Sequence, residues 1–413
     1  MLRFKFTSRV WFWPAVCVAA ALPCSRPASA QSPAAAPSPP WPHLQVNGLI
    51  DLYYQVDPRN STVPITLVGT DGVRLRQDLG GRAFDLQVNA LRLNLFELNF
   101  AVSPSRRVPL GFDAKLTAGD TATVVHLTEP GGTGAWQSVQ QLYVTVPFGG
   151  GSSAVNVDAG IFVTPFGNEV IESSGNDAYS RGLLFTYAIP FYHAGLRFTS
   201  TSSSHVAWVA ELVNGWNDIA DDNGAKSVIG QITYTFNPAW NLTVGAMDGD
   251  EGEGIYGPLV PKGKGAISTQ LYELLAGWSP KGRLRLNAEL DLGAGAGSDN
   301  GRHVSGSWDG VAVFGHYALG RGFALALRGE QFDDNPGVGS LAGPGGAGGL
   351  RVVNGATRLR EATLTLEYAR GPSGLLTRLE VRHDHANSRF FPLNANGGAR
   401  DQDTVTLAEI YRF

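Results

Sequence analysis

Hydrophobic and polar residues alternate one by one along most of this chain. The alternation is sharpest in 228–236, 283–292, 323–330 and 375–384. In 283–292, leucines and an alanine fall on one face, while arginine, asparagine, glutamate and aspartate fall on the other. A period of two residues is the signature of a β-strand with two different faces. The pattern therefore predicts an all-β protein.

The length and charge of these strands indicate what surrounds them. The segments are about ten residues long, which is the length that a tilted strand needs to cross a bilayer; strands of soluble proteins are usually shorter. The polar faces carry several charges each, which suits a wet interior better than a dry core. We therefore expect a single antiparallel transmembrane β-barrel over residues 45–413. A soluble all-β domain is the alternative.

The connections between strands fall into a short and a long class. Short links are expected at 103–107, 148–153, 237–238, 279–282, 320–321 and 371–373. Long links, rich in Gly, Asp, Asn and Pro, are expected at 57–84, 119–135, 215–226, 247–268, 294–303, 333–357 and 387–403. Short periplasmic turns and long extracellular loops are typical of outer-membrane barrels.

Regular alternation of short and long links fails only between Gly160 and Asn214. It is restored if 182–190 belongs to a long loop instead of a spanning strand. The barrel then has about 16 strands, both of its ends lie in the periplasm, and it is wide enough for an aqueous channel. Barrels of fourteen or eighteen strands are the alternatives.

The first thirty residues have the pattern of a secretory signal peptide. A basic start, MLRFKFTSR, precedes an apolar stretch at 10–22 that is too short for a transmembrane helix. Ala28-Ser29-Ala30 provides the small residues that signal peptidase recognises, so we expect residues 1–30 to be removed. Residues 31–44, rich in Pro and Ala, are expected to form a flexible periplasmic leader.

Cysteine content and charge exclude several classes of function. Both cysteines, Cys17 and Cys24, lie in the signal peptide, so the mature chain would have no disulfide and no thiolate metal ligand. Lipid attachment at Cys24 is disfavoured because Pro23 precedes it. The net charge is −4, and the signal peptide contains only basic charges, so the mature chain would be more acidic still. This argues against a nucleic-acid partner.

The chain ends in TVTLAEIYRF, in which Phe413 shares a face with Tyr411, Leu407 and Val405. This resembles the signal by which the barrel-assembly machinery recognises outer-membrane barrels, although Glu409 departs from it. Tyr411 and Phe413 are therefore candidate assembly-signal residues. Their rings are expected in the periplasmic aromatic girdle, next to outer-membrane lipid. An ordinary amphipathic edge strand is the alternative.

Residues 160–197 read GIFVTPFGNEVIESSGNDAYSRGLLFTYAIPFYHAGLR. They contain a G-x-F-x-x-P-F-G-x-E element, an acidic residue, N-x-x-Y-S-R and H-x-G-x-R, at Gly160, Phe162, Pro165, Phe166, Gly167, Glu169, Glu172, Asn176, Tyr179, Ser180, Arg181, His193, Gly195 and Arg197. With these motifs the chain, from about Val46 to Phe413, resembles the OmpL-like family of outer-membrane β-barrel porins. The resemblance implies a barrel in the Gram-negative outer membrane and passive transport, without specifying a solute.

The polar faces of the strands supply candidates for a pore lining. In a barrel these faces point to the lumen, where rings of charge set ion preference. The candidates are Arg283, Arg285, Glu289, Asp291, Arg328, Glu330, Arg378, Glu380, Arg382 and Asp384. Both signs of charge occur, so neither anion nor cation preference is predicted. In the alternative interpretation these charges pair across strands and stiffen the wall.

The segment 163–192 is a candidate constriction loop. The parity of the links removes it from the barrel wall, and it carries Glu169, Glu172, Asp177 and Arg181 between two prolines. We hypothesise that it folds into the barrel mouth. The alternative is an ordinary outer loop.

No enzyme, metal or cofactor is expected. No motif joins Ser, His and acidic residues into a catalytic constellation. His383 and His385 share a strand face but lack a third ligand, and the acidic stretch 248–253 lacks the spacing of a known calcium loop. The Gly-rich stretch 343–346 is not followed by a helix, so it is not a phosphate-binding loop.

The sequence thus predicts an outer-membrane porin that passes small hydrophilic solutes or ions by diffusion through a water-filled, charged lumen. The alternative is a barrel without transport, acting as an adhesin or structural anchor through its extracellular loops. An energised receptor would need a plug domain and a larger barrel than this chain provides. A homo-oligomer is expected only by analogy with other porins.

Overall fold

A computed structural model describes most of the chain. The described residues are 43–59, 65–68, 74–105, 108–127, 129, 134, 136–150, 154–201, 203–221, 223–251, 267–280, 282–299, 302–335, 357–371, 374–391 and 398–413. The predicted signal peptide and almost all of the predicted leader lie outside these ranges. Among the described residues, no helix is both long enough and apolar enough to cross a membrane.

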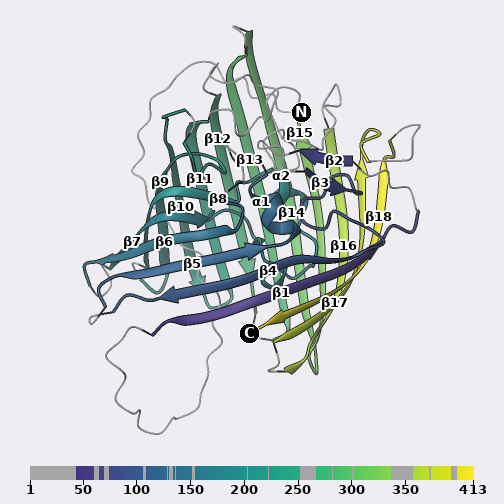
Figure 1. Ribbon diagram of the computed structural model, residues 1–413, viewed down its shortest axis with the longest axis horizontal. Coiled ribbons are helices and arrows are strands. Elements are labelled where there is room, and N and C mark those ends of the chain that lie inside the picture. Colours follow the sequence, from purple (N-terminus) through teal and green to yellow (C-terminus); the bar gives the residue numbers. More distant parts are fainter. Residues whose placement is uncertain are drawn as a thin grey trace.

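Within the described part of the chain, sixteen strands form one closed antiparallel barrel (Figure 1). They are β1 (Gln45–Val56), β4 (Leu91–Val102), β5 (Gly111–Ala118), β6 (Val139–Phe148), β7 (Val155–Val163), β8 (Tyr192–Thr201), β9 (Val206–Val213), β10 (Ser227–Asn237), β11 (Trp240–Glu251), β12 (Ile267–Trp278), β13 (Leu284–Asp299), β14 (Arg302–Gly320), β15 (Phe323–Asp334), β16 (Thr357–Ala369), β17 (Leu375–Ala386) and β18 (Asp401–Arg412). Between β1 and β4, the strands β2 (Ile65–Val68) and β3 (Arg74–Gln77) form a separate hairpin. The predicted strand number and the all-β barrel are confirmed.

The barrel closes where its last strand meets its first. β18 pairs antiparallel with β1, with Leu49 opposite Arg412 and Val56 opposite Val405. Gly48 and Phe413 exchange two backbone hydrogen bonds, of 2.9 and 3.0 Å. A side chain at Gly48 would come within 2.7 Å of the Phe413 ring at the seam and of the Glu97 carbonyl oxygen on β4, so glycine permits the close approach of both neighbours.

The parity prediction for residues 182–190 is confirmed. This stretch contains the short helix α2 (Leu183–Tyr187) instead of a spanning strand, and it is buried inside the barrel. A second short helix, α1 (Asp120–Val125), follows β5. In Figure 1 both helices are enclosed by the ring of strands.

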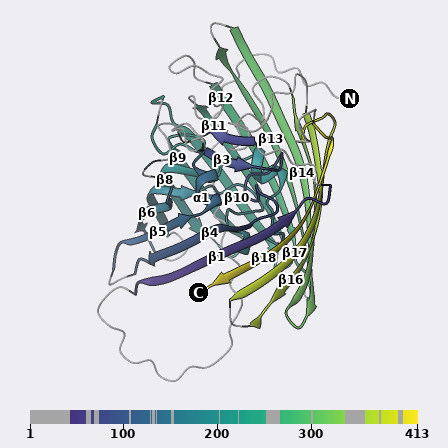
Figure 2. The same ribbon diagram turned by 45° about the vertical axis from the view of Figure 1, so that its right-hand side comes forward.

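One predicted loop is wrong. Residues 294–303 do not form a long link, because β13 and β14 remain paired as far as Asp299 and Arg302. The Gly-rich sequence resembles a loop, but Gly293 lies opposite Trp308, whose large indole occupies the space that a side chain at 293 would need. Both views show this hairpin projecting beyond its neighbours (Figures 1 and 2).

The two faces of the wall divide as the alternation predicts. Large apolar side chains are exposed on the outer face, among them Leu286, Leu290, Leu327, Leu364, Leu379 and Leu407, whereas most of the charged candidates point inward and are buried. Exposed aromatic residues gather near the short-turn ends of their strands: Phe148, Phe236, Trp240, Tyr317, Phe323, Tyr368, Tyr411 and Phe413. An apolar band with an aromatic border is typical of a barrel in lipid.

The hydrophobic core lies in the lumen and not between strand faces. It is built mainly from segments that enter the barrel from the long-loop end, with buried residues that include Phe84, Leu86, Phe166, Leu183, Leu184, Phe185, Ile189 and Phe191. The leucine-rich faces of the strands therefore point outward, and the chain between the strands supplies the dry centre.

The outer face gives the first testable prediction. The Leu327 side chain is 56% exposed near the middle of β15. Leu327→Arg is expected to lower the free energy of unfolding by about 2–4 kcal/mol, because a charge would enter the apolar part of the bilayer. The measurement is urea unfolding in lipid vesicles, with Leu327→Ala as control. An equal loss for both variants would contradict a lipid-facing position.

Candidate functional site

The central feature of the lumen is the inner segment, defined as residues 164–191 between β7 and β8. A backbone hydrogen bond of 3.0 Å, from the Thr164 N–H to the Phe191 carbonyl, joins the two ends of this segment. Gly167 has φ of 91°, a left-handed conformation that favours glycine, and the chain turns there into the barrel. From Ala178 to Phe191 every residue is buried. The candidate constriction loop thus lies inside the barrel.

The arginines of the barrel wall bind backbone carbonyls of the inner segment. Arg378 on β17 donates to the carbonyls of Ser173 at 2.5 Å and of Ala178 at 3.0 Å. Arg328 on β15 donates to the Ser180 carbonyl at 2.5 Å. An irregular segment has many unpaired backbone groups, and guanidinium groups satisfy several at once.

Arg382 on β17 acts in the same way, donating to the Arg181 carbonyl at 2.7 Å. The Arg181 side chain itself points back into the segment, where its Nε donates to the Ile171 carbonyl at 3.0 Å. Its guanidinium also lies 4.7 Å from the centre of the Phe84 ring. Arg181 therefore stabilises the fold of the inner segment.

Acidic residues of the wall bind the amide groups of the inner segment. Glu380 accepts hydrogen bonds from the backbone N–H of Tyr179 at 2.5 Å and of Ser180 at 3.1 Å. Glu330 accepts from the N–H of Leu183. Within the segment, Glu169 accepts from the Gly182 N–H at 2.6 Å and pairs with Arg328 at 2.6 Å. Charges of both signs therefore fix the segment against β15 and β17.

A second segment, residues 78–88, docks beside the inner segment. Arg82 forms an ion pair of 2.9 Å with Asp384 on β17, and Gly80 exchanges two hydrogen bonds with the Gln402 side chain on β18. Phe84 packs against Phe185, with ring centres 5.7 Å apart. Both segments thus share the dry cluster at the centre of the barrel.

One edge of the inner segment remains in contact with water. Val170 is 44% exposed and Gly175 is also exposed, although the segment lies inside the barrel. Asp177 pairs there with Arg285 of β13, whose side chain is 46% exposed. We call Val170, Gly175 and Asp177 the wet edge. Because lipid cannot reach these residues, their exposure indicates water in part of the lumen.

Glu172 connects the inner segment to β5 in the barrel wall. Its carboxylate pairs with Lys115 on β5 and accepts a hydrogen bond of 2.9 Å from Gln140. Burial by itself would raise the pKa of Glu172, but the neighbouring Lys115 ammonium lowers that pKa to about 2. The inner segment is therefore held by charged groups on β5 and on β17, which lie four strands apart around the barrel.

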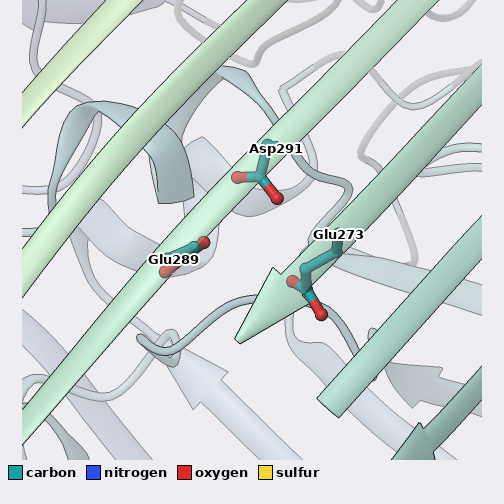
Figure 3. A group of neighbouring side chains, drawn as sticks. All are labelled: Glu273, Glu289 and Asp291. Atoms are coloured by element: carbon teal, nitrogen blue, oxygen red, sulfur yellow. The ribbon is translucent and has the colours of Figure 1, made fainter. Parts of the chain in front are cut away.

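Three acidic side chains lie close together beside the start of the inner segment (Figure 3). They are Glu273 on β12 and Glu289 and Asp291 on β13. Glu273 accepts a hydrogen bond from the Gly167 N–H, and Glu289 accepts one of 3.1 Å from the Asn168 N–H. The sequence pattern placed Glu289 and Asp291 on an inward face but missed Glu273. The missing information was the register that sets Glu273 directly opposite Asp291.

The ten candidate lining residues thus occupy different surroundings. Eight are buried beneath the inner segments: Glu289, Asp291, Arg328, Glu330, Arg378, Glu380, Arg382 and Asp384. Arg285 meets water at the wet edge, and Arg283 is exposed near the short-turn end, within 3.4 Å of the Leu319 carbonyl. The predicted role of all ten in ion preference stays a prediction.

The remaining candidates lie away from the lumen. His383 and His385 are on the outer face of β17, bound through Nδ1 to Asp403 at 2.6 Å and to Asp401 at 2.7 Å on β18. The rings of Tyr411 and Phe413 stack outside the barrel with centres 5.8 Å apart. Recognition of these two rings during assembly stays a prediction.

Comparison with known proteins agrees with this architecture. The family model described as "Putative beta-barrel porin-2, OmpL-like" matches residues 43–413. None of the curated proteins matches the chain.

Several solved outer-membrane proteins share the fold. An anion-selective porin from Comamonas acidovorans superimposes with a TM-score of 0.55 at 10% identity, covering 90% of this chain and 99% of the porin. The outer membrane channel DcaP of Acinetobacter baumannii gives 0.52 at 10% identity, covering 90% and 97%. OmpT of Vibrio cholerae in a trimer form gives 0.51 at 9% identity, covering 90% and 99%. At these identities the likeness concerns the fold alone.

The buried ion pairs predict a strong effect of one arginine. Arg328 is 1% exposed and contacts Glu169, Glu361 and the Ser180 carbonyl. Arg328→Ala is expected to lower the free energy of unfolding by about 3–5 kcal/mol, because it removes the buried positive charge that pairs with Glu169 and Glu361. Urea unfolding in vesicles measures this loss.

The matched control is Arg358→Ala, which removes a half-exposed arginine from its pair with Asp333. It should cost at most about 1 kcal/mol, as surface pairs do. Equal losses for both variants would show that the inward charges do not hold the inner segment.

Proposed function

Since the chain belongs to the OmpL-like family of β-barrel porins of the Gram-negative outer membrane, we propose that it is a passive pore for small hydrophilic solutes or ions. The observation that carries the proposal is the wet edge of the inner segment. A barrel that served only as an anchor would have no need of exposed and charged groups inside its lumen. Diffusion needs no catalytic step, and we assign none.

In this proposal the inner segment is the constriction. It is held to the wall at β5, β15 and β17, and the dry cluster fills part of the lumen beside it. Solutes then pass along the wet edge, between Asp177, Arg285 and the partly exposed side chains of β5 and β8. The passage is narrow, so we expect a small conductance.

The candidate lining residues then divide into two roles. Arg285 faces the solute, whereas the buried arginines and acids of β15 and β17 position the constriction. This agrees with the alternative that many inward charges pair and stiffen the structure. Of the four constriction candidates, Asp177 lies at the wet edge, Glu172 anchors the segment to β5, and Glu169 and Arg181 hold the segment together.

The dry centre is also the observation that favours the competing function, a closed barrel that serves as an adhesin or anchor. The two functions differ in one measurement. A pore gives discrete open-channel steps in a planar lipid bilayer, and a closed barrel gives none.

Deletion of residues 168–180 tests the constriction directly. The deletion removes the wet edge together with several anchoring contacts, so single-channel conductance is expected to increase several-fold. Heat-modifiable migration on a gel checks that the variant is folded. Unchanged conductance would remove the constriction from the proposal, and a lack of channel steps in both proteins would favour the anchor.

A single charge reversal tests the proposed path. Arg285→Glu places a negative charge at the wet edge and is expected to shift the reversal potential in a salt gradient toward cation preference. Arg360→Glu is the matched control, because Arg360 is exposed on the outer face of β16. A shift of the same size in both variants, or in neither, would contradict passage beside Arg285.

A further inference from the structure

Three acidic side chains on β12 and β13 form a compact cluster of like charge in the described lumen. One carboxylate oxygen from each residue lies within 4.8 Å of those from the other two, and all three side chains are buried. Figure 3 shows that they come from two neighbouring strands, with Glu289 and Asp291 on one and Glu273 on the other. We call Glu273, Glu289 and Asp291 the acidic triad.

Among the described residues, no basic side chain is paired with the triad. No described lysine or arginine forms an ion pair with Glu273, Glu289 or Asp291, and the buried Arg328 on β15 is paired with Glu169 and Glu361. Three adjacent buried carboxylates without a counter-charge are strongly unfavourable. The negative charge of the triad therefore has to be neutralised by something other than a basic side chain of the described residues.

The oxygens of the triad are oriented but not fully used. Glu273 is held by the Gly167 N–H and by the Gln231 side chain, the latter at 3.1 Å, and one Glu289 oxygen is held by the Asn168 N–H. The second Glu289 oxygen and both Asp291 oxygens have no hydrogen-bond partner in the described structure. Asp291, which is 0% exposed, thus contributes an unpartnered oxygen to the cluster.

We propose that the acidic triad binds a divalent metal cation, and that Ca²⁺ fits it best. The ligand set consists only of oxygen atoms, which hard cations prefer and which zinc and copper sites rarely rely on alone. Calcium accepts several carboxylates at about 2.3–2.6 Å in irregular geometry, so its ligand oxygens can lie nearly 5 Å apart. Magnesium requires shorter bonds and keeps more of its own water.

The site has a structural consequence for the inner segment. The same carboxylates that would ligate the ion also accept the N–H groups of Gly167 and Asn168. A bound cation would fix these side chains and, through them, the turn at which the inner segment enters the lumen. The proposal concerns binding and holds whether or not the barrel conducts.

Titration of Ca²⁺ into the purified, chelator-treated barrel in detergent tests the site by isothermal calorimetry. The intact protein is expected to bind a single ion in the lumen. Asp291→Asn should weaken binding by more than about tenfold, since even the loss of an outer-shell partner costs about 10–100-fold in metal affinity. A parallel titration with Mg²⁺ should show weaker binding.

The matched control is the double variant Asp248→Asn and Asp250→Asn, which neutralises exposed acids at the loop end of β11. This variant should bind Ca²⁺ as the intact protein does. Binding that is lost in the control and kept in Asp291→Asn would place calcium at the surface and overturn the proposal, as would the absence of any binding to the intact protein.

Measuring the unfolding temperature shows whether Asp291→Asn is folded and whether Ca²⁺ binds to it. Asp291→Asn removes an unpaired buried charge, so without calcium it should unfold at a temperature no lower than that of the intact barrel. Added Ca²⁺ should raise the unfolding temperature of the intact barrel only, because a ligand stabilises the state that binds it. Equal stabilisation of both proteins would also overturn the proposal.

Discussion

The structure depends on closure of the sheet between β1 and β18. In lipid, an unpaired strand edge would leave backbone groups without any hydrogen-bond partner, so only a closed barrel can expose its strands to the membrane. Once the sheet is closed, the outer face must be apolar, and every other residue must point into the lumen. The paired seam at Gly48 and Phe413 is therefore the condition for the lipid face, for the inward charges and for everything bound inside.

The inward charges create a second problem, which the inner segment solves. A row of arginines and acids facing an apolar cluster would be costly, and a loop without regular structure has unpaired backbone groups of its own. The two sets satisfy one another: Arg378 binds carbonyls and Glu380 binds amides of the same segment. Mutual satisfaction explains how a wide barrel contains a dry centre made from its own loops.

The acidic triad and the wet edge are two places in the described structure where this mutual satisfaction is incomplete. At the wet edge, water completes the solvation of Asp177 and Arg285, and this is the path proposed for solutes. Asp291 is 0% exposed and pairs with no basic side chain in the described structure, and a cation is the proposed complement. Function is therefore sought where the protein does not neutralise its own charges.

The sequence by itself determined the wall of the barrel. Alternation with a period of two is a local property, and lipid outside and polar surroundings inside impose it on every strand. For the same reason, link parity sufficed to exclude 182–190 as a strand.

Only the tertiary structure decided which inward charges are shielded from solvent. Arg328 meets Ser180, and Glu273 meets Gly167, through contacts between residues more than a hundred positions apart, which no local pattern encodes. The hairpin at 294–303 was missed for a related reason, since the residue that fills the space over Gly293 lies on another strand.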